Sequence, residues 1–244
     1  LSIGLATANI VVAIGLLGLR PGVARYLPRR SEKEYKKRIL ADAVQLGLLA
    51  TGTACVILYI FSGQISSIIG SPESRQVLQA FAICVPFMML FRLSLGGIQG
   101  DKNTKVKVIL QNMTFPTLHL SILGLIFIFG YGLSWIIGSY VITYMVSAIL
   151  GVFYIFNKYN DARVDHLESY KTDLIKFSAP LAASGIVVVL LGTADTILLS
   201  RFQPSDDVGI YNSVYPITKA LMFALTAFGF LSLPELSELD SHDK

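Results

Sequence analysis

The arrangement of apolar residues in long blocks most constrains what this chain can fold into. The blocks run for about 19–24 residues between short polar stretches, and about 20 apolar residues are needed to cross roughly 30 Å of hydrocarbon as a helix. Of the 244 residues, 53% are hydrophobic and only 15% are charged, against about 25% charged in an average soluble domain. The sequence therefore predicts an all-α polytopic membrane protein, and it excludes intrinsic disorder and a disulfide-stapled secreted domain.

We expect seven transmembrane helices. Their approximate bounds are 1–19, 43–61, 77–98, 108–130, 133–156, 177–200 and 214–233. Placed on alternate sides of the membrane, the connections and tail carry 17 of the 20 Lys and Arg residues on one side and two on the other, and one lies within a span. Because Lys and Arg concentrate in cytoplasmic loops, this predicts a multi-pass protein of the cell membrane with Leu1 outside and a cytoplasmic C-terminal tail. The first residues already resemble the middle of an apolar helix, so we expect a fragment that lacks one preceding span.

Ionisable residues within spans are candidate functional residues, since a charge at membrane depth costs a few kcal/mol or more. Asp195 lies in the outer half of the sixth span, where it lines a cavity as a proton or cation site or makes a structural hydrogen bond. Lys219 lies near the outer end of the seventh span, where it binds an anionic ligand or extends to the interface. An ion pair between the two would satisfy both.

Two arginines lie in the inner half of the spans. Arg92 follows an apolar run that begins near Val77, and Arg20 closes the first span. Asn9, Ala13, Leu16 and Arg20 follow one another at spacings of four, three and four. These spacings predict that Asn9 and Arg20 share one helical face. These residues could form a cationic vestibule for a pyrophosphate, because the guanidinium fork matches phosphate oxygens. For most of the loop charges, the explanation remains the ordinary excess of Lys and Arg in cytoplasmic loops.

The fourth span carries several polar residues. Asn112, Pro116 and His119 follow one another at spacings of four and three, so we expect them on one face. Proline bends a span and is tolerated beside a polar cavity. His119 is either a packed, hydrogen-bonded side chain or part of a proton relay.

No catalytic or metal-binding motif of a soluble enzyme is present. The sequence contains no Walker A loop, HExxH, CxxC or GxSxG, so we expect neither an enzyme nor a metal site. Cys55 and Cys84 lie inside apolar blocks and are interpreted as small core residues. The excess of Lys and Arg over acidic residues is interpreted as a sign of orientation in the membrane rather than of nucleic-acid binding.

The two ends of the chain show a weak internal similarity. The segments that start at Gly4 and Gly209 both run through one span into Leu-Pro and a charged stretch. The first and seventh spans also run in the same direction, as a six-helix repeat would produce. We therefore expect a first lobe over 1–156, a cytoplasmic linker over 157–176 and the start of a second lobe over 177–244.

Four stretches carry a family resemblance: GLRPGVARYLPRR (Gly18–Arg30), SEKEYKKR (Ser31–Arg38), KFSAPLAASGIVVVLLGTADTILLSRF (Lys176–Phe202) and VGIYNSVYPI (Val208–Ile217). They resemble polysaccharide transport proteins, the O-antigen and lipid-linked oligosaccharide flippases of the multidrug/oligosaccharidyl-lipid/polysaccharide exporter superfamily. The resemblance implies twelve to fourteen helices in two lobes, of which this chain would hold spans two to eight.

The resemblance also implies a mechanism. The head group of a polyprenyl-pyrophosphate-linked glycan would enter a central cationic cavity while its tail stays in the bilayer, and alternating access coupled to a proton or sodium gradient would release it outside. No cofactor is implied, and polysaccharide polymerase or ligase machinery are candidate partners. By chemistry and position, the expected cavity residues are Arg20, Arg92, Lys219, Asp195, Asn112, His119 and Asn9.

Three other readings remain. A drug or cation antiporter of the same superfamily would favour an acidic cavity, whereas this chain offers more basic candidates. A retinal protein needs a carboxylate one turn before its lysine, and position 215 is Tyr. A membrane scaffold of a glycan-assembly complex, without transport of its own, stays open.

Overall fold

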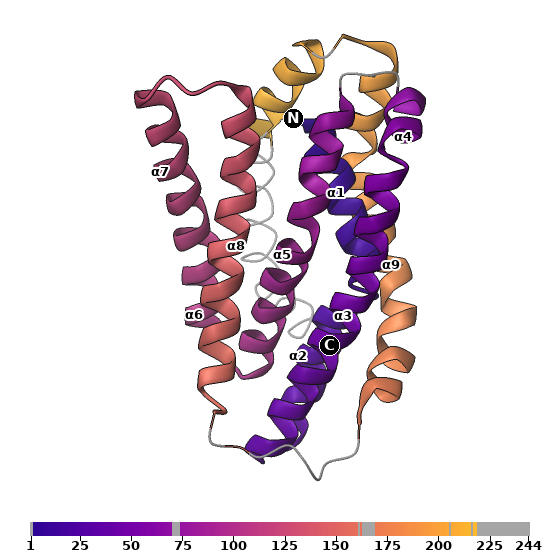
Figure 1. The fold of residues 1–244 in the computed structure, drawn as a ribbon. Helices are drawn as coiled ribbons and strands as arrows, with labels where there is room; N and C mark the ends of the chain where they lie inside the picture. Colours follow the sequence, from indigo (N-terminus) through magenta and orange to yellow (C-terminus); the bar gives the residue numbers. More distant parts are fainter. Residues whose placement is uncertain are drawn as a thin grey trace, which may run out of the picture.

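A computed structural model describes residues 2–69, 74–160, 162, 169–204, 206–215 and 217–218. In these ranges the chain forms helices joined by short connections, without strands (Figure 1). The helices are α1 (Ser2–Gly15), α2 (Leu19–Tyr26), α3 (Lys33–Ile60), α4 (Ser62–Ile69), α5 (Ser74–Gly100), α6 (Thr104–Val108), α7 (Phe115–Ile128), α8 (Leu133–Asn157) and α9 (Lys171–Phe202). A 3₁₀ turn, η1 (Leu27–Arg29), follows α2, and a π-helical segment, η2 (Ile109–Thr114), joins α6 to α7. Residues 206–215 are also helical.

Five helical segments are long and apolar enough to cross a membrane: Lys33–Ile60, Arg75–Gly100, Thr104–Ile128, Ser134–Asn157 and Lys171–Phe202. Ser2–Gly15 and Leu19–Arg29, which meet at a bend of 47°, are long and apolar enough only when they are taken together as one bent span. The prediction of an all-α polytopic membrane protein is confirmed. Most of the expected seventh span, 214–233, lies outside the described residues.

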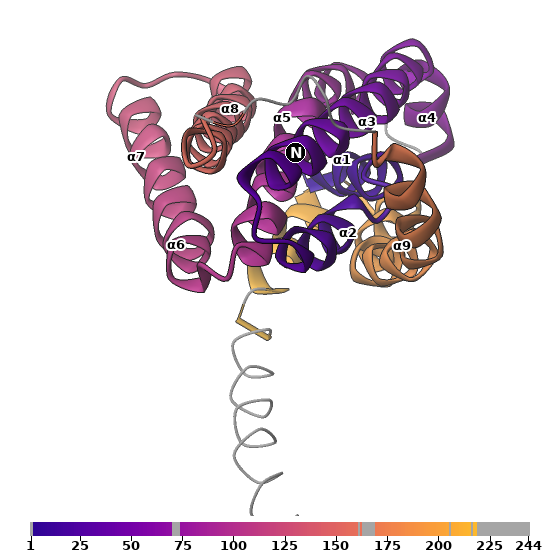
Figure 2. The same cartoon turned by 90° about the horizontal axis from the view of Figure 1, so that it is seen from below.

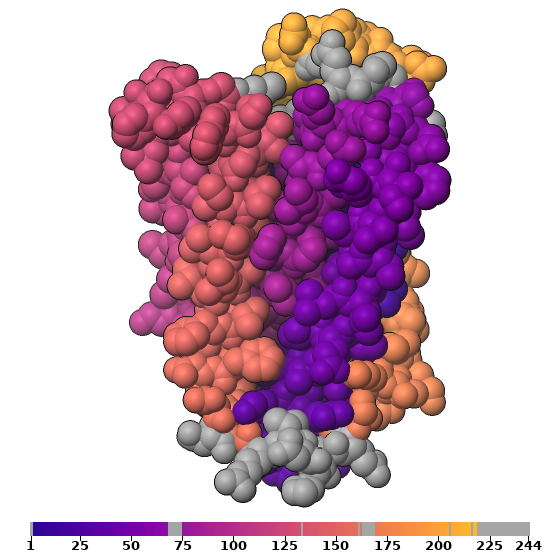
Figure 3. Space-filling model, viewed as in Figure 1, coloured from indigo at the N-terminus to yellow at the C-terminus, as the bar shows by residue number. Residues whose placement is uncertain are grey.

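The connections between spans alternate between the two ends of the molecule (Figure 1). Residues 27–38, 101–107, 157–160 and 169–171 lie at one end, which we call the basic end because these described residues hold most of the chain's Lys and Arg residues. α4 and the α7–α8 turn lie at the opposite end, which is the top of the molecule in Figure 1 and Figure 3. This arrangement agrees with the alternation from which the spans were predicted.

The first span differs from its predicted bounds. Leu17 (φ 45°) and Gly18 (φ 69°) adopt left-handed backbone conformations that interrupt the helix, which then continues through α2 rather than ending at residue 19. Pro21 stands in the first turn of α2, where its missing N–H costs nothing because first-turn amides have no helical partner. Arg20 therefore lies within a bent span rather than at its end.

Several other boundaries also differ. The expected connection 62–76 contains α4, and the regular helix expected over 108–130 contains the π segment η2. α3 begins ten residues before the predicted start at 43, and α9 begins at Lys171, inside the expected linker. Both helices extend at the basic end, where the flanking polar side chains can be solvated while the backbone stays helical.

α5 is the central helix, and it packs against α1, α2, α3 and α8 (Figure 2). Because lipid is as apolar as a core side chain, spans associate through close packing of small residues. A Cβ at Gly96 would lie 2.8 Å from the carbonyl oxygen of Arg20, and one at Gly100 would lie 3.0 Å from the Cα of Ala24. The glycines of α5 therefore let the α2 backbone approach it directly. Both cysteines are free thiols, and Cys84 is buried on α5.

Candidate functional site

A cavity of about 150 Å³ lies between α1, α2, α5 and α9. It is lined by Ala13, Leu16, Gly18, Arg20, Pro21, Arg92, Leu181, Ala182, Gly185 and Val189. Arg20 and Arg92 are the charged members of this lining. The structure thus brings together the two arginines that the sequence suggested as a cationic vestibule.

Arg92 is held by neutral partners. Its Nη2 donates a hydrogen bond to Oδ1 of Asn9 on α1, and the Tyr144 side chain of α8 interacts with the same guanidinium. The sequence placed Asn9 on the face of Arg20 by counting along one continuous helix. That count fails because the helix breaks at Leu17 and Gly18, and Asn9 reaches the site by contacting Arg92 instead.

A third cation, Lys107, lies near the arginines. Arg20 packs over Gly96 of α5, and the Lys107 ammonium is close enough to the Arg20 guanidinium for their charges to repel. Lys107 donates to Oε1 of Gln99 at 2.9 Å. Sequence reasoning counted Lys107 only as a topology marker, and no local motif could have shown that its side chain turns toward Arg20.

The three cations have no acidic partner within the described ranges. The three ion pairs there are Lys36–Asp101, Arg38–Asp42 and Lys158–Asp101. Cations gathered at partly buried positions repel one another and lack the compensation that such charges normally find. An entering anion would supply it, and the two guanidinium groups match phosphate oxygens.

α9 covers the cavity on the side of α2. A Cβ at Gly18 would collide with the Ser178 backbone and lie 2.9 Å from the amide nitrogen of Ala182, and Gly22 faces the Ser178 hydroxyl. Nearer the basic end, the Arg25 guanidinium lies over the Phe177 ring, 4.2 Å from its centroid. Sites that enclose drug-sized ligands measure roughly 300–1,000 Å³, so in this conformation the contact between α2 and α9 leaves little room beside the arginines.

Asp195 lies outside this cavity. It follows Gly185 by ten residues on α9, about 15 Å farther along the helix. Its Oδ2 accepts a hydrogen bond from the Tyr211 hydroxyl at 2.8 Å, and its Oδ1 accepts one from the Thr196 amide at 2.8 Å. The carboxylate thus joins α9 to the helical residues 206–215. Lys219, the expected partner of Asp195, lies outside the described residues.

Asn112 and His119 lie in different surroundings. Asn112 is exposed on the π segment η2, whose wider turns shift the register that the spacing assumed. Nδ1 of His119 lies 3.2 Å from Oγ1 of Thr143 on α8, and its ring centroid is 4.3 Å from that of Tyr140. Because the Thr143 hydroxyl donates to the Ser139 carbonyl, Thr143 accepts from Nδ1–H of His119. His119 therefore packs α7 against α8.

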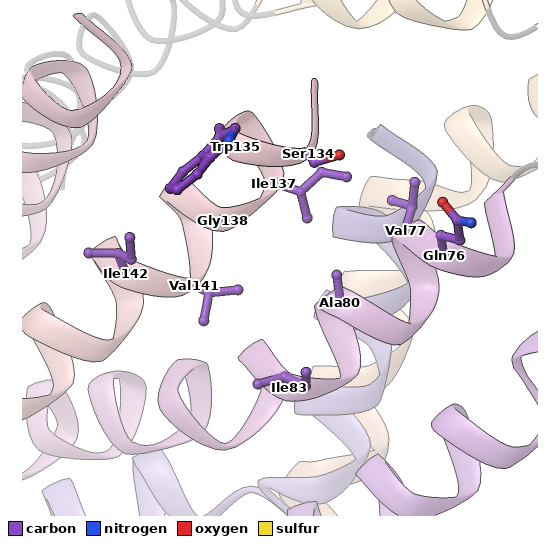
Figure 4. Close-up of a pocket in the computed structure, with 10 residues that line it drawn as sticks. All are labelled: Gln76, Val77, Ala80, Ile83, Ser134, Trp135, Ile137, Gly138, Val141 and Ile142. Carbon is purple, nitrogen blue, oxygen red and sulfur yellow. The ribbon is translucent and has the colours of Figure 1, made fainter. Parts of the chain in front are cut away.

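A second cavity, of about 510 Å³, lies between α5 and α8 toward the end opposite the basic end (Figure 4). Val77, Ala80 and Ile83 of α5 lie across it from Val141 and Ile142 of α8 (Figure 4). Gln76, Ser134, Trp135, Ile137 and Gly138 complete the lining. With no charged residue in this lining, the space suits hydrocarbon rather than a polar head group.

Comparison with known proteins gives one match. Residues 1–239 match the model of a family described as polysaccharide biosynthesis protein. No curated protein and no solved structure matches the chain. The family resemblance drawn from the sequence is confirmed.

Proposed function

This chain belongs to the polysaccharide biosynthesis protein family, and on that basis we propose that it moves a polyprenyl-pyrophosphate-linked oligosaccharide across the cytoplasmic membrane by alternating access. The family fits a transport role in polysaccharide assembly, and its members are in general transporter-like membrane proteins rather than enzymes. The pyrophosphate of the head group is the part that the cavity recognises. The polyprenyl tail stays in the bilayer.

The observation that carries this proposal is the pair of arginines that line one cavity without a described acidic partner. A pyrophosphate offers several oxygens to two guanidinium forks at once. Lys107 adds a third positive charge beside Arg20. An antiporter for cationic drugs would favour an acidic cavity, whereas Asp195 does not line this cavity and accepts hydrogen bonds from Tyr211 and Thr196.

Release and entry of the head group require the contact between α2 and α9 to open. This contact rests on the close approach of Gly18 and Gly22 to Ser178 and on the stacking of Arg25 over Phe177. Separating α9 from α2 would widen the cavity toward the basic end. In this scheme α9 opens the second lobe, 177–244, and moves relative to the first lobe, 1–156, about the linker 157–176.

The same scheme orients the protein. Because the loop assignment predicted from the sequence puts 17 of the 20 Lys and Arg residues on the side of the basic end, we place that end in the cytoplasm. Head groups made in the cytoplasm would then enter between α2 and α9. A proton or sodium gradient would drive the return of the lobes, and polymerase or ligase machinery would take over the product outside.

The test measures binding before transport. The purified chain in detergent is titrated with polyprenyl pyrophosphate, and Arg92→Gln is expected to weaken binding by about ten- to a hundredfold, the worth of a hydrogen-bonded charge. Arg75→Gln, the same change at an exposed position of α5, is the matched control. Wild-type binding by Arg92→Gln would remove the cavity from the mechanism.

Transport is followed in proteoliposomes with a labelled polyprenyl-pyrophosphate oligosaccharide. We expect the head group to become accessible to an added impermeant hydrolase, and Arg92→Glu to abolish this while still inserting into the membrane. Uptake of a cationic dye against an ion gradient, with no rise in head-group accessibility, would assign the protein to the antiporters instead.

A further inference from the structure

A groove of about 510 Å³ runs between α8 and the π-helical end of the fourth span. It is lined by Val106, Ile109, Leu110, Thr114, Leu150, Phe153, Tyr154, Asn157 and Lys158. The helical spacing of Leu150, Phe153, Tyr154, Asn157 and Lys158 places these residues on one face of α8. The groove is lined by α6, η2, α8 and Lys158, whereas the arginine cavity is lined by residues from α1 to α2, from α5 and from α9.

The lining changes character along its length. Leu150 and Phe153 of α8 are exposed apolar side chains, and Ile109 and Leu110 face them from η2. The last two α8 residues of the lining, Asn157 and the exposed Lys158, are polar. From Leu150 to Lys158 the distance along the helix is about 12 Å. The groove is therefore apolar toward the membrane interior and polar at the basic end.

The polar end carries positive charge in excess. Lys105 is an exposed residue of α6, directly before the lining residue Val106 and one helical turn before Ile109. Asp101 is the described carboxylate nearest to Lys158, and it is shared between Lys158 and Lys36. A single carboxylate balances only one of these three lysines.

The rim of the groove is formed by the π-helical segment η2 and by a hydrogen bond between Asn103 and Tyr154. η2 interrupts the α-helical register with wider turns, a feature that often marks functional sites. The Asn103 side chain caps the following turn at the Val106 amide and donates to the Tyr154 hydroxyl at 2.6 Å. This contact joins the two walls of the groove where its apolar part ends.

We propose that this groove binds an anionic phospholipid of the surrounding bilayer, with one acyl chain between η2 and α8 and the phosphate at Lys105, Lys158 and Asn157. The apolar length accepts the chain, and the excess charge at the rim selects an anionic over a zwitterionic head group. The proposal is independent of the transport cycle, because the groove shares no lining residue with the arginine cavity.

Native mass spectrometry of the detergent-purified chain tests it with phosphatidylglycerol and phosphatidylcholine of the same acyl chains. We expect phosphatidylglycerol to be retained preferentially. Lys105→Gln should reduce that preference about fivefold, which corresponds to about 1 kcal/mol for a lysine near a lipid phosphate. Leu150→Trp, which fills the groove, should reduce retention of both lipids.

Lys33→Gln is the matched control, because Lys33 is an exposed lysine of the basic end on α3, a helix that contributes no residue to the groove lining. Thermal unfolding of each variant in the same detergent shows that the fold is intact. The proposal fails if Lys105→Gln keeps the wild-type preference or if Lys33→Gln lowers it equally. It also fails if polyprenyl phosphate displaces phosphatidylglycerol in wild type but not in Leu150→Trp, since the groove would then hold the substrate's tail.

Discussion

Charged side chains are used in opposite ways at the basic end and in the cavity. At the basic end Asp42 and Asp101 are almost fully buried, and each is paired with at least one cation. In the cavity Arg92 donates to the neutral Asn9, and neither Arg20 nor Arg92 has an acidic partner among the described residues. Because an uncompensated charge costs free energy in the folded state, we infer that the paired charges stabilise the fold, whereas the unpaired ones are the candidates for ligand binding.

Removing a paired carboxylate gives the largest expected effect. Asp42 has a 1% exposed side chain, accepts from the Tyr170 amide at 2.7 Å and pairs with Nε of Arg38 at 3.3 Å. Asp42→Ala leaves the Arg38 cation without its ion-pair partner and the Tyr170 amide without its acceptor, and should lower the free energy of unfolding by about 3 kcal/mol. Unfolding in mixed SDS and detergent micelles measures it.

The matched control for this change is Asp173→Ala, which removes an exposed acid in the first turn of α9. Its cost should stay within about 0.5 kcal/mol. Equal losses for the two variants would contradict the assignment of Asp42 as the residue that fastens the start of α9 to α3.

Packing rather than charge should hold the cavity walls together. Gly18 has a left-handed φ of 69°, and a Cβ there would meet the Ser178 and Ala182 backbones. Gly18→Ala should therefore lower the free energy of unfolding by about 2 kcal/mol, from strain and overpacking combined. The measurement is the same SDS titration.

Gly124→Ala provides the contrast, because Gly124 is helical and has open space around it. There the change should raise the free energy of unfolding by about 0.5–1 kcal/mol through helix propensity. A stabilising Gly18→Ala would show that α2 and α9 do not meet as closely as the structure places them.

Neutralising a cavity arginine should have a small effect on stability. Arg92→Met removes a partly buried, unpaired cation, which should stabilise the fold. It also removes the hydrogen bond to Asn9, which should destabilise the fold. We expect the free energy of unfolding to stay within about 1 kcal/mol of wild type, while polyprenyl pyrophosphate binding is lost. A stability loss as large as that of Asp42→Ala would make Arg92 a structural residue.

The spans could be predicted from the sequence because each one depends on the composition of a single continuous stretch of residues. A block of about 20 apolar residues has one stable arrangement in a bilayer, and the alternation of Lys and Arg follows from the connections between blocks. The arginines were found the same way, since an ionisable group near a span needs a reason. The break at Leu17 and Gly18 had a local signal in Gly18 and Pro21 that the span prediction did not use.

The contacts of the site could not be predicted, because they depend on which helices pack together. Asn9 was assigned to Arg20 by periodicity, yet it accepts from Arg92 on another helix. The register between Asn112 and His119 was lost in the π segment, which no spacing rule anticipates. Lys107 joins the cations only through the packing of the fourth span beside α5.

The smallest effect is the pH dependence of the Asp101 cluster at the basic end. Burial alone would raise the pKa of Asp101, but hydrogen bonds from Lys158 and Tyr159 and the charges of Lys158 and Lys36 together lower it. Burial and the hydrogen bond to Asp101 raise the pKa of Tyr159. A carboxyl with a lowered pKa stabilises the fold above its unfolded value, about 3.9, and loses that contribution as the pH falls through the folded value. A phenol with a raised pKa stabilises below about pH 10 and loses its contribution above.

The cluster should therefore contribute a constant stability between about pH 5 and 9 and lose it in acid. We expect the difference in unfolding free energy between wild type and Asp101→Asn to be constant over that range and to shrink below about pH 4. Arg92→Met, which touches no described carboxylate, should keep a constant offset from wild type over the same acid range. An Asp101→Asn difference that persists undiminished at pH 3 would mean that the carboxylate is not stabilised by its lysines, and the contrast between paired and unpaired charges would then rest on Asp42 alone.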